Sequence, residues 1–145
     1  MSFPVPQPGL VIRYSYLWER EARTGRDEGI KDRPCAIVLV LLRDGDAPPV
    51  RVLPVTHSAP VYALDALEIP EPVKRRLGLD AERSWVMLTE ANDFIWPGPD
   101  LRPAVNGNAA SIAYGFLPPG FMRVLRDRLA ERRRAGSLLA VRRPE

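Results

Sequence analysis

The 145-residue sequence is poor in the residues that build cross-links and metal sites. It contains one cysteine, Cys35, and one histidine, His57. A single cysteine excludes an internal disulfide framework, and together with one histidine it cannot form a conventional structural zinc site. Cys35 follows a proline at the start of an apolar run, so we expect an inert, buried thiol. We therefore expect no metal and no other cofactor.

Long hydrophobic runs and the common nucleotide-binding motifs are missing as well. The longest apolar run, Ala36 to Leu42, is far shorter than the ~20 residues that cross a bilayer. The first ten residues lack the basic and apolar regions of a signal peptide. There is no P-loop, dinucleotide-binding glycine fingerprint, nucleophile elbow or His-Glu metal motif. With 46% hydrophobic and 27% charged residues, the sequence predicts one globular domain over residues 1–145, cytoplasmic and without membrane contact.

Charge is divided unevenly along the chain. Residues 119–145 contain eight arginines and three acidic residues, a net charge of +5, whereas residues 1–118 contain 13 basic and 15 acidic residues, a net charge of −2. A basic C-terminal end on a weakly acidic body can attract polyanions. A solvated helix face with Arg132 to Arg134 in water explains the same pattern without a ligand. If the chain were a structural or assembly protein, we would expect this basic end to be its interaction surface.

Hydrophobic patterning predicts a mainly β fold. Stretches rich in β-branched, aromatic or continuous apolar residues predict strands over 9–18, 34–42, 50–56, 84–89 and 94–96. Turn-forming residues at 44–49, among them Gly45, Pro48 and Pro49, predict that the second and third of these strands form an antiparallel pair. Before the first strand, the three prolines of residues 1–8 predict an irregular lead-in. The charged stretch Glu19 to Asp32 is expected to be a long loop, and loops of that length tend to be functional.

Two helices are expected beside the strands. Residues 71–77 have Pro72 near the start and Gly78 after the end, which are the residues preferred at those positions. The last helix is amphipathic and ends at Gly136, with an apolar stripe of Phe121, Met122, Leu125 and Leu129. Residues 137–145 are then a basic tail, and residues 100–118 receive no assignment. Short strands without regular βα alternation describe a small curled sheet with helices packed on it.

Two short segments bring polar side chains to one predicted sheet edge. Arg33 and Pro34 precede the second strand, and Thr56, His57 and Ser58 end the third. If these strands are antiparallel neighbours, Arg33 lies close to Thr56. Alternation places Thr56 and Ser58 on one face and His57 on the other.

This combination suits phosphodiester transfer. Metal-free cleavage of RNA needs a proton acceptor for the 2′-hydroxyl, a proton donor for the leaving oxygen and donors for the phosphorane charge. Arginine can bind phosphate through two hydrogen bonds, threonine can donate to a non-bridging oxygen, and His57 can exchange protons near neutral pH. A purely structural interpretation remains open, in which Arg33 pairs with Asp32 or Glu28, Thr56 ends a strand and His57 lies on the surface.

The first 58 residues resemble the MazF/PemK family of toxin endoribonucleases. The resemblance is carried by Gly9…Tyr16-Leu17-Trp18…Gly25…Gly29…Lys31-Asp32-Arg33-Pro34-Cys35-Ala36-Ile37-Val38-Leu39 and by Val52-Leu53-Pro54-Val55-Thr56-His57-Ser58. It implies an SH3-like β-barrel of the MazF/PemK/CcdB type and a homodimer neutralised by a separate antitoxin protein. It further implies cleavage of single-stranded RNA to a 2′,3′-cyclic phosphate and a 5′-hydroxyl. The family's catalytic arginine and threonine fall on Arg33 and Thr56, and the 19–31 loop is expected to gate the groove.

Beyond residue 58 the sequence departs from the family pattern. Members carry Asp-Gln-x-Arg after the next strand, where this chain has Thr89-Glu90-Ala91-Asn92-Asp93. Either these polar residues contribute differently, or the substrate or activity has changed. The predicted RNA-binding residues are Ser58, Glu90, Asn92 and Trp96, with Trp96 stacking on bases. The alternative is a catalytically silent barrel that binds nucleic acid or a protein partner.

Overall fold

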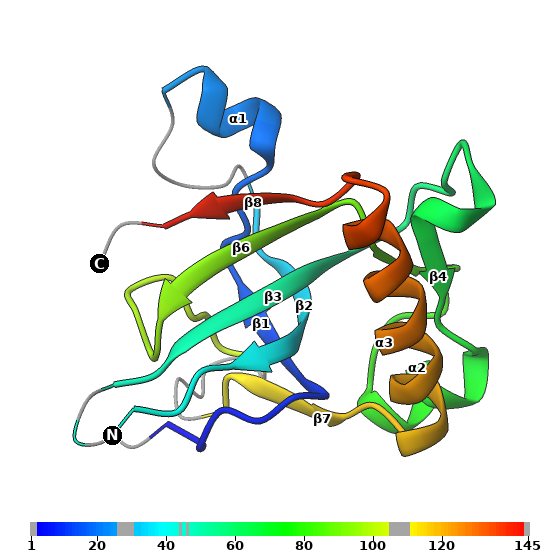
Figure 1. Cartoon of the computed structure of the whole chain (residues 1–145). Helices are drawn as coiled ribbons and strands as arrows, with labels where there is room; N and C mark the ends of the chain where they lie inside the picture. Colours follow the sequence, from blue (N-terminus) through cyan, green and yellow to red (C-terminus); the bar gives the residue numbers. More distant parts are fainter. Residues whose placement is uncertain (1–2, 26–30, 44, 46, 105–110, 144–145) are drawn as a thin grey trace.

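The computed structural model describes residues 3–25, 31–43, 45, 47–104 and 111–143, and its strands form one curled sheet (Figure 1). The eight strands are β1 (Leu10–Tyr14), β2 (Arg33–Val40), β3 (Pro49–Thr56), β4 (Ala66–Glu68), β5 (Trp85–Met87), β6 (Glu90–Ile95), β7 (Ala113–Phe116) and β8 (Leu139–Arg142). The helices are α1 (Glu19–Arg23), α2 (Glu71–Leu77) and α3 (Pro119–Arg134), with a 3₁₀ turn at Ala63–Asp65. The mainly β prediction is confirmed.

The sheet divides at β3. On one edge β3 pairs with β2 along most of its length, and β2 continues to β1 and β7. On the other edge, residues 49–52 of β3 pair with β6, whereas Val55 and Thr56 pair with β5. No pairing within the described residues joins β7 back to β4 or β8, so the sheet stays open. The end of β3 therefore lies where two branches of the sheet separate.

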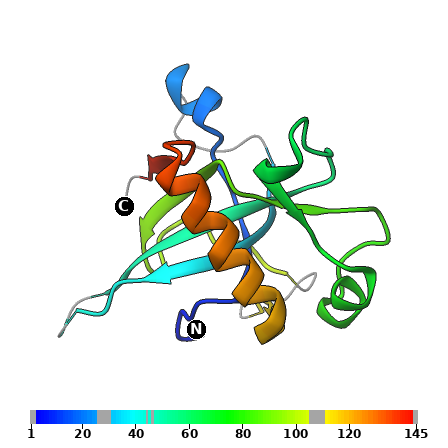
Figure 2. The same cartoon turned by 45° about the vertical axis from the view of Figure 1, so that its right-hand side comes forward.

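Both faces of the sheet are covered by apolar side chains. Val11, Ala36 and Leu53 point to the face on which α3 packs through Met122, Leu125 and Leu129. Figure 2 shows α3 crossing this face. The opposite face holds a second cluster that includes Ile12, Cys35, Ile37, Val52, Phe94 and Trp96. This two-sided burial explains why β2 reads as a continuous apolar run.

The helices follow their sequence signals closely. α2 has the predicted bounds, and Gly78 adopts the left-handed conformation (φ +72°) that glycine accepts without a Cβ clash. In α3 the predicted residues Met122, Leu125 and Leu129 are buried, and Gly136 (φ +73°) follows its end. None of the described helices has the length and apolar character needed to span a membrane.

Several segments differ from the sequence-based expectation. The expected first strand ends at Tyr14, and the expected 19–32 loop begins with α1, capped by the Glu21 carboxylate, which accepts from Trp18 N at 3.0 Å. Residues 26–30 of that loop lie outside the described residues. The strands expected at 84–89 and 94–96 are β5 and a longer β6 that starts at Glu90. The unassigned stretch contributes β7 and a bridge between Tyr14 and Leu101.

The C-terminal segment is not a basic tail. Residues Leu139 to Arg142 form β8, which pairs in parallel with β6. Arg143 is 3% exposed, and its guanidinium donates to Ser15 O at 2.6 Å and to Asn92 Oδ1 at 3.0 Å. Its second terminal nitrogen lies 3.1 Å from the buried carboxylate of Asp100. The sequence charge count missed this arrangement because the partners are distant in the chain.

We expect Arg143→Ala to lower the free energy of unfolding by about 3–5 kcal/mol, because it removes the nearer cation of the buried Asp100 carboxylate, at 3.1 Å, and leaves Arg102 at 3.9 Å. Urea denaturation measures this loss. Arg142→Ala is the matched control, since Arg142 is exposed on the same strand, and surface changes stay within about 0.5 kcal/mol. Equal losses in the two variants would contradict a structural role for the buried guanidinium.

Candidate functional site

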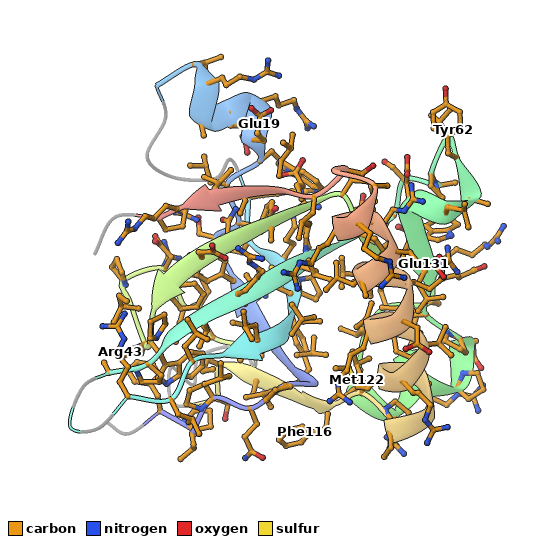
Figure 3. All side chains as sticks on the ribbon, viewed as in Figure 1. Glu19, Arg43, Tyr62, Phe116, Met122 and Glu131 are labelled. Atoms are coloured by element: carbon orange, nitrogen blue, oxygen red, sulfur yellow. The ribbon has the colours of Figure 1, made fainter. Side chains whose placement is uncertain are left out.

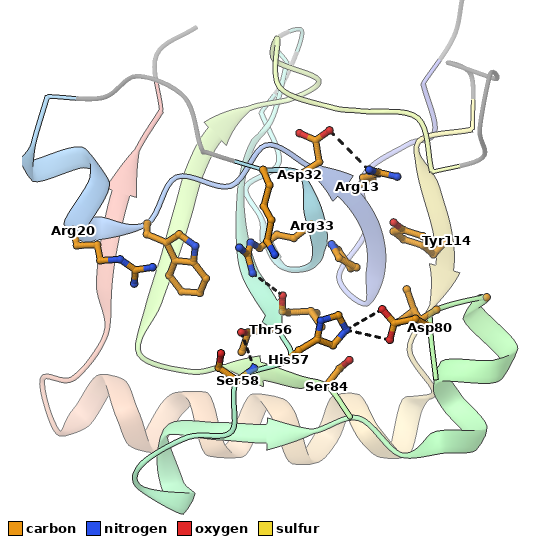
Figure 4. A pocket seen from close by; sticks show the side chains of 16 residues that line it. Arg13, Arg20, Asp32, Arg33, Thr56, His57, Ser58, Asp80, Ser84 and Tyr114 are labelled. Atoms are coloured by element: carbon orange, nitrogen blue, oxygen red, sulfur yellow. Dashed lines mark hydrogen bonds and ion pairs between the residues drawn. The ribbon is translucent and has the colours of Figure 1, made fainter. Parts of the chain in front are cut away.

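A pocket of about 430 Å³ opens where β2 begins and β3 ends (Figure 4). It is lined by residues from both strands, by the segment after β1, by the turn after α2 and by Tyr114 of β7. Arg33, Thr56, His57 and Ser58 all line it. The structure thus brings together the four polar residues that the sequence placed at one sheet edge.

The register of β2 and β3 sets Arg33 beside Thr56. Cys35 pairs with Pro54 and Ala36 with Leu53, so continuing the antiparallel ladder places Arg33 opposite Thr56. The predicted antiparallel pairing is therefore confirmed. Thr56 is partly exposed, and its hydroxyl oxygen accepts from Ser58 N at 3.1 Å. The hydroxyl hydrogen remains free to point at a ligand.

Arg33 is held by backbone and aromatic contacts rather than by an acid. Its Nη1 donates to Val55 O at 3.3 Å, and its guanidinium lies 4.8 Å from the centre of the Trp18 ring. Within the described residues its Nε has no hydrogen-bond partner, and it forms no ion pair. Burial lowers the pKa of Arg33 because it disfavours the charged form. A guanidinium in this state can gain a strong, charge-assisted contact from an incoming anion.

Trp18 and Arg20 extend the cationic wall of the pocket. The Arg20 guanidinium lies 5.2 Å from the centre of the Trp18 ring, and the Arg33 guanidinium lies 4.8 Å from the same centre. Trp18, Arg20, Lys31 and Arg33 also line an adjoining hollow of about 290 Å³. The two hollows therefore adjoin at these four residues, and Glu21 is the acidic residue among the described residues that line the second hollow.

His57 faces carboxylates. Its Nε2 lies 2.9 Å from Asp80 Oδ2, and its Nδ1 lies 3.3 Å from Glu82 Oε2. Both contacts are hydrogen bonds when both ring nitrogens carry a proton. Although the sequence alternation placed His57 on the opposite face from Thr56, both line the pocket, because the strand ends at Thr56 and alternation stops there.

A buried lysine anchors the Asp80 side of the pocket. The Lys74 side chain is 5% exposed, and its Nζ donates to Asp80 Oδ1 at 3.0 Å, to Ser84 Oγ at 2.7 Å and to Glu82 O. The ligand-type atoms of His57, Asp80 and Glu82 lie within 4.8 Å of one another. Because Lys74 already supplies a positive charge to Asp80, we interpret this group as an ion-pair cluster and assign no metal to it.

Sequence reasoning missed several residues that line the pocket. Arg13 and Asp32 form an ion pair at 4.0 Å, and Tyr114 presents a phenol whose pKa is raised by burial, so that it stays a neutral donor. Their common signal is position at strand ends, which becomes visible only when the strand order is known. Four cations, Arg13, Arg20, Lys31 and Arg33, stand against Asp32 and Asp80 in the lining. The pocket therefore favours an anion.

Three of the predicted RNA-binding residues lie outside the pocket. Asn92 is fully buried, and its amide binds the backbone of Leu17 at 2.9 and 2.7 Å. Trp96 is 6% exposed and belongs to the core cluster of Phe94. The Glu90 carboxylate accepts from Tyr16 OH and from Glu19 N, each at 3.0 Å. These residues support the fold, so only Ser58 of the four is placed to contact a ligand there.

In comparisons with known proteins, no protein-family model matches this chain and no curated sequence is significantly similar to it.

The Asp80 carboxyl should titrate below its ordinary value of 3.8. Partial burial raises the pKa of Asp80, but hydrogen bonds from Lys74 and His57 outweigh this effect and lower it. The native state then holds fewer protons than the unfolded chain near pH 4. The resulting stabilisation is present above 3.8 and is lost as the pH falls through the native pKa.

Carbon NMR of the Asp80 carboxyl against pH measures this pKa, with the urea-unfolded protein as reference. In His57→Gln one charged donor is lost, so the native titration midpoint should move upward. A wild-type midpoint at or above that of the unfolded chain would show that the ion-pair cluster does not form.

Proposed function

We propose that this protein is a metal-independent endoribonuclease acting on single-stranded RNA. One observation carries the proposal: the guanidinium of Arg33 and the hydroxyl of Thr56, from adjacent strands, line one pocket that is rich in cations, and no carboxylate of the described residues binds Arg33 there. A phosphate is the ligand that fits such a pair, because guanidinium binds two phosphate oxygens and the hydroxyl donates to a third.

The reaction that these groups support is transfer of the phosphoryl group within the RNA. The 2′-oxygen attacks the neighbouring phosphorus and passes its proton to solvent water, while the bond from phosphorus to the 5′-oxygen breaks and that oxygen gains a proton from His57. The products are a 2′,3′-cyclic phosphate and a 5′-hydroxyl. Arg33 and Thr56 stabilise the charge that develops on the non-bridging oxygens, which is the largest single contribution in many such reactions.

His57 is the proposed group for proton exchange. It is the only imidazole in the chain and lines the same pocket as Arg33 and Thr56. With a proton on each ring nitrogen, it can release one to the leaving 5′-oxygen. Asp80 then keeps the ring oriented through Nε2.

The resemblance of the first 58 residues extends the proposal to the fold type and partners. We propose an SH3-like arrangement for the sheet, supported by the antiparallel succession β1–β2–β3 and by the branching of β3 toward β5 and β6. A homodimer and a neutralising antitoxin protein follow from the same resemblance.

A catalytically silent module that binds RNA or a protein is the second candidate. It is favoured by the engagement of Glu90, Asn92 and Asp93, three polar side chains in the segment that departs from the family pattern. Glu90 and Asn92 bind backbone groups, and Asp93 forms a two-pronged contact with Arg51 at 2.8 and 2.9 Å. None of the three lines the pocket.

Arg33→Ala should lower the rate of RNA cleavage by about 10²–10³, because it removes the donor that meets the developing charge. The assay uses single-stranded RNA of mixed sequence with a metal chelator present, and mass spectrometry identifies the cyclic phosphate ends. Arg75→Ala is the matched control, since Arg75 is exposed, pairs with Glu71 and lies outside the pocket. Wild-type protein that binds this RNA without cutting it would favour the silent module.

His57→Gln should lower the cleavage rate by about 10²–10⁴ and remove one limb of the pH–rate profile. The shape of the pH–rate profile separates proton transfer from a structural role. If His57 only held Asp80 in place, its loss would lower the rate by the same factor at every pH. A variant that keeps both limbs would remove His57 from the reaction.

A further inference from the structure

The two flanks of α3 use their arginines differently. On one side of the buried stripe, Arg128 donates to Ala63 O at 2.9 Å and Arg132 lies 3.6 Å from Asp65, so both are bound to the neighbouring loop. On the other side, the helical repeat places Arg123, Arg126 and Arg133 together. All three are exposed. We call this second side the arginine flank.

Two hollows run along the arginine flank. A hollow of about 510 Å³ is lined by Arg76, Arg123 and Arg126, and a smaller one of about 190 Å³ by Arg126 and Arg133. Because Arg126 lines both, they form one track beside the helix. With a rise of ~1.5 Å per residue, Arg123 and Arg133 lie about 15 Å apart along the axis.

No acidic side chain among the described residues pairs with the arginine flank, although Asp127 lies one turn from Arg123 on the helix. Within the described part of the chain, Arg123, Arg126 and Arg133 form no ion pair, and Arg76 contacts only the backbone oxygen of Phe116, at 3.5 Å. No acidic residue of the described part of the chain lines either hollow. Similar charges collected without partners repel one another, so a polyanion that binds them stabilises the group.

Apolar side chains form the floor of the larger hollow. Figure 3 labels Phe116 and Met122 at the Pro119 end of α3, and both line this hollow. Phe116 is 46% exposed although it is aromatic. An exposed aromatic ring beside arginines suits unstacked bases, which a duplex does not offer.

We propose that the arginine flank of α3, with Arg76 and Phe116, binds single-stranded nucleic acid. Its arginines contact the phosphates and Phe116 stacks on a base. The arginine flank shares no lining residue with the Arg33 pocket, so the inference does not depend on the chemistry proposed there.

The test measures binding of a fluorescent single-stranded RNA with every 2′-hydroxyl methylated, so that the probe cannot be cut by 2′-oxygen attack. Fluorescence anisotropy is recorded over a range of salt concentrations for the wild type and for Arg123→Gln/Arg126→Gln/Arg133→Gln. We expect the triple variant to raise Kd by about tenfold or more. The slope of log K against log salt should fall in magnitude by about 2, since each phosphate contact on a single strand contributes about 0.7.

The control variant is Arg23→Gln/Arg75→Gln/Arg83→Gln. It removes the same total charge, but each of its arginines is exposed and paired with a glutamate. Kd for the control should stay within about twofold of the wild type. Equal loss in the two triple variants would reduce the effect to net charge and overturn the proposal.

A glutamate decamer distinguishes an acidic protein partner from a nucleic acid. If the decamer displaces the RNA at equal charge concentration and its own binding depends on the three arginines, the arginine flank is a protein-binding surface and the proposal is wrong. Phe116→Ala should weaken RNA binding without changing the salt slope. The cleavage assay on Arg33→Ala is read separately, so failure of either proposal leaves the other standing.

Discussion

The register between β2 and β3 is the constraint on which the candidate site depends. Along β2, Cys35 and Ile37 share a face with Arg33, and along β3, Val52 shares a face with Thr56. The apolar members of these rows are buried in one core cluster, so a slip of one residue would turn them toward the opposite cluster, which other side chains already fill, and would turn Arg33 away from Thr56. The free energy of core packing therefore also positions the two polar groups. No specific contact between Arg33 and Thr56 is required.

A buried polar network supports the side of the pocket that is formed by Trp18. Asn92 binds both backbone groups of Leu17, and Arg143 binds Asn92, Ser15 and Asp100. These contacts hold the chain where it leaves β1, immediately before Trp18. Trp18 in turn lies 4.8 Å from the Arg33 guanidinium, so Arg143, the residue after β8, supports the segment that contacts Arg33 without itself lining the pocket. Buried polar groups of this kind must be fully satisfied to be tolerated, which restricts the segment to one conformation.

The arginines of the chain divide into those that the fold uses and those that it leaves available. The side chains of Arg143, Arg128 and Arg132 bind backbone oxygens and carboxylates. Arg33 and the arginine flank of α3 have no acidic partner among the described residues. Net charge alone could not separate these groups, because an ion-paired arginine and an available one contribute equally to it. The distinction depends on which carboxylates the chain brings within reach.

Elements whose signals are local could be predicted from the sequence. α2, α3 and the β2–β3 pair follow from caps, apolar stripes and a Gly-Pro turn, and these place Arg33, Thr56, His57 and Ser58 at one edge. The roles of Asn92, Trp96 and Arg143 became visible only in the folded chain, because these residues look like surface groups in the sequence and are buried in the fold. The tertiary structure likewise brought Tyr114 and Asp80 to the pocket from distant segments. A polar side chain can be buried only where other segments supply its hydrogen-bond partners. Periodicity within one segment does not predict those partners, because they are distant in the sequence.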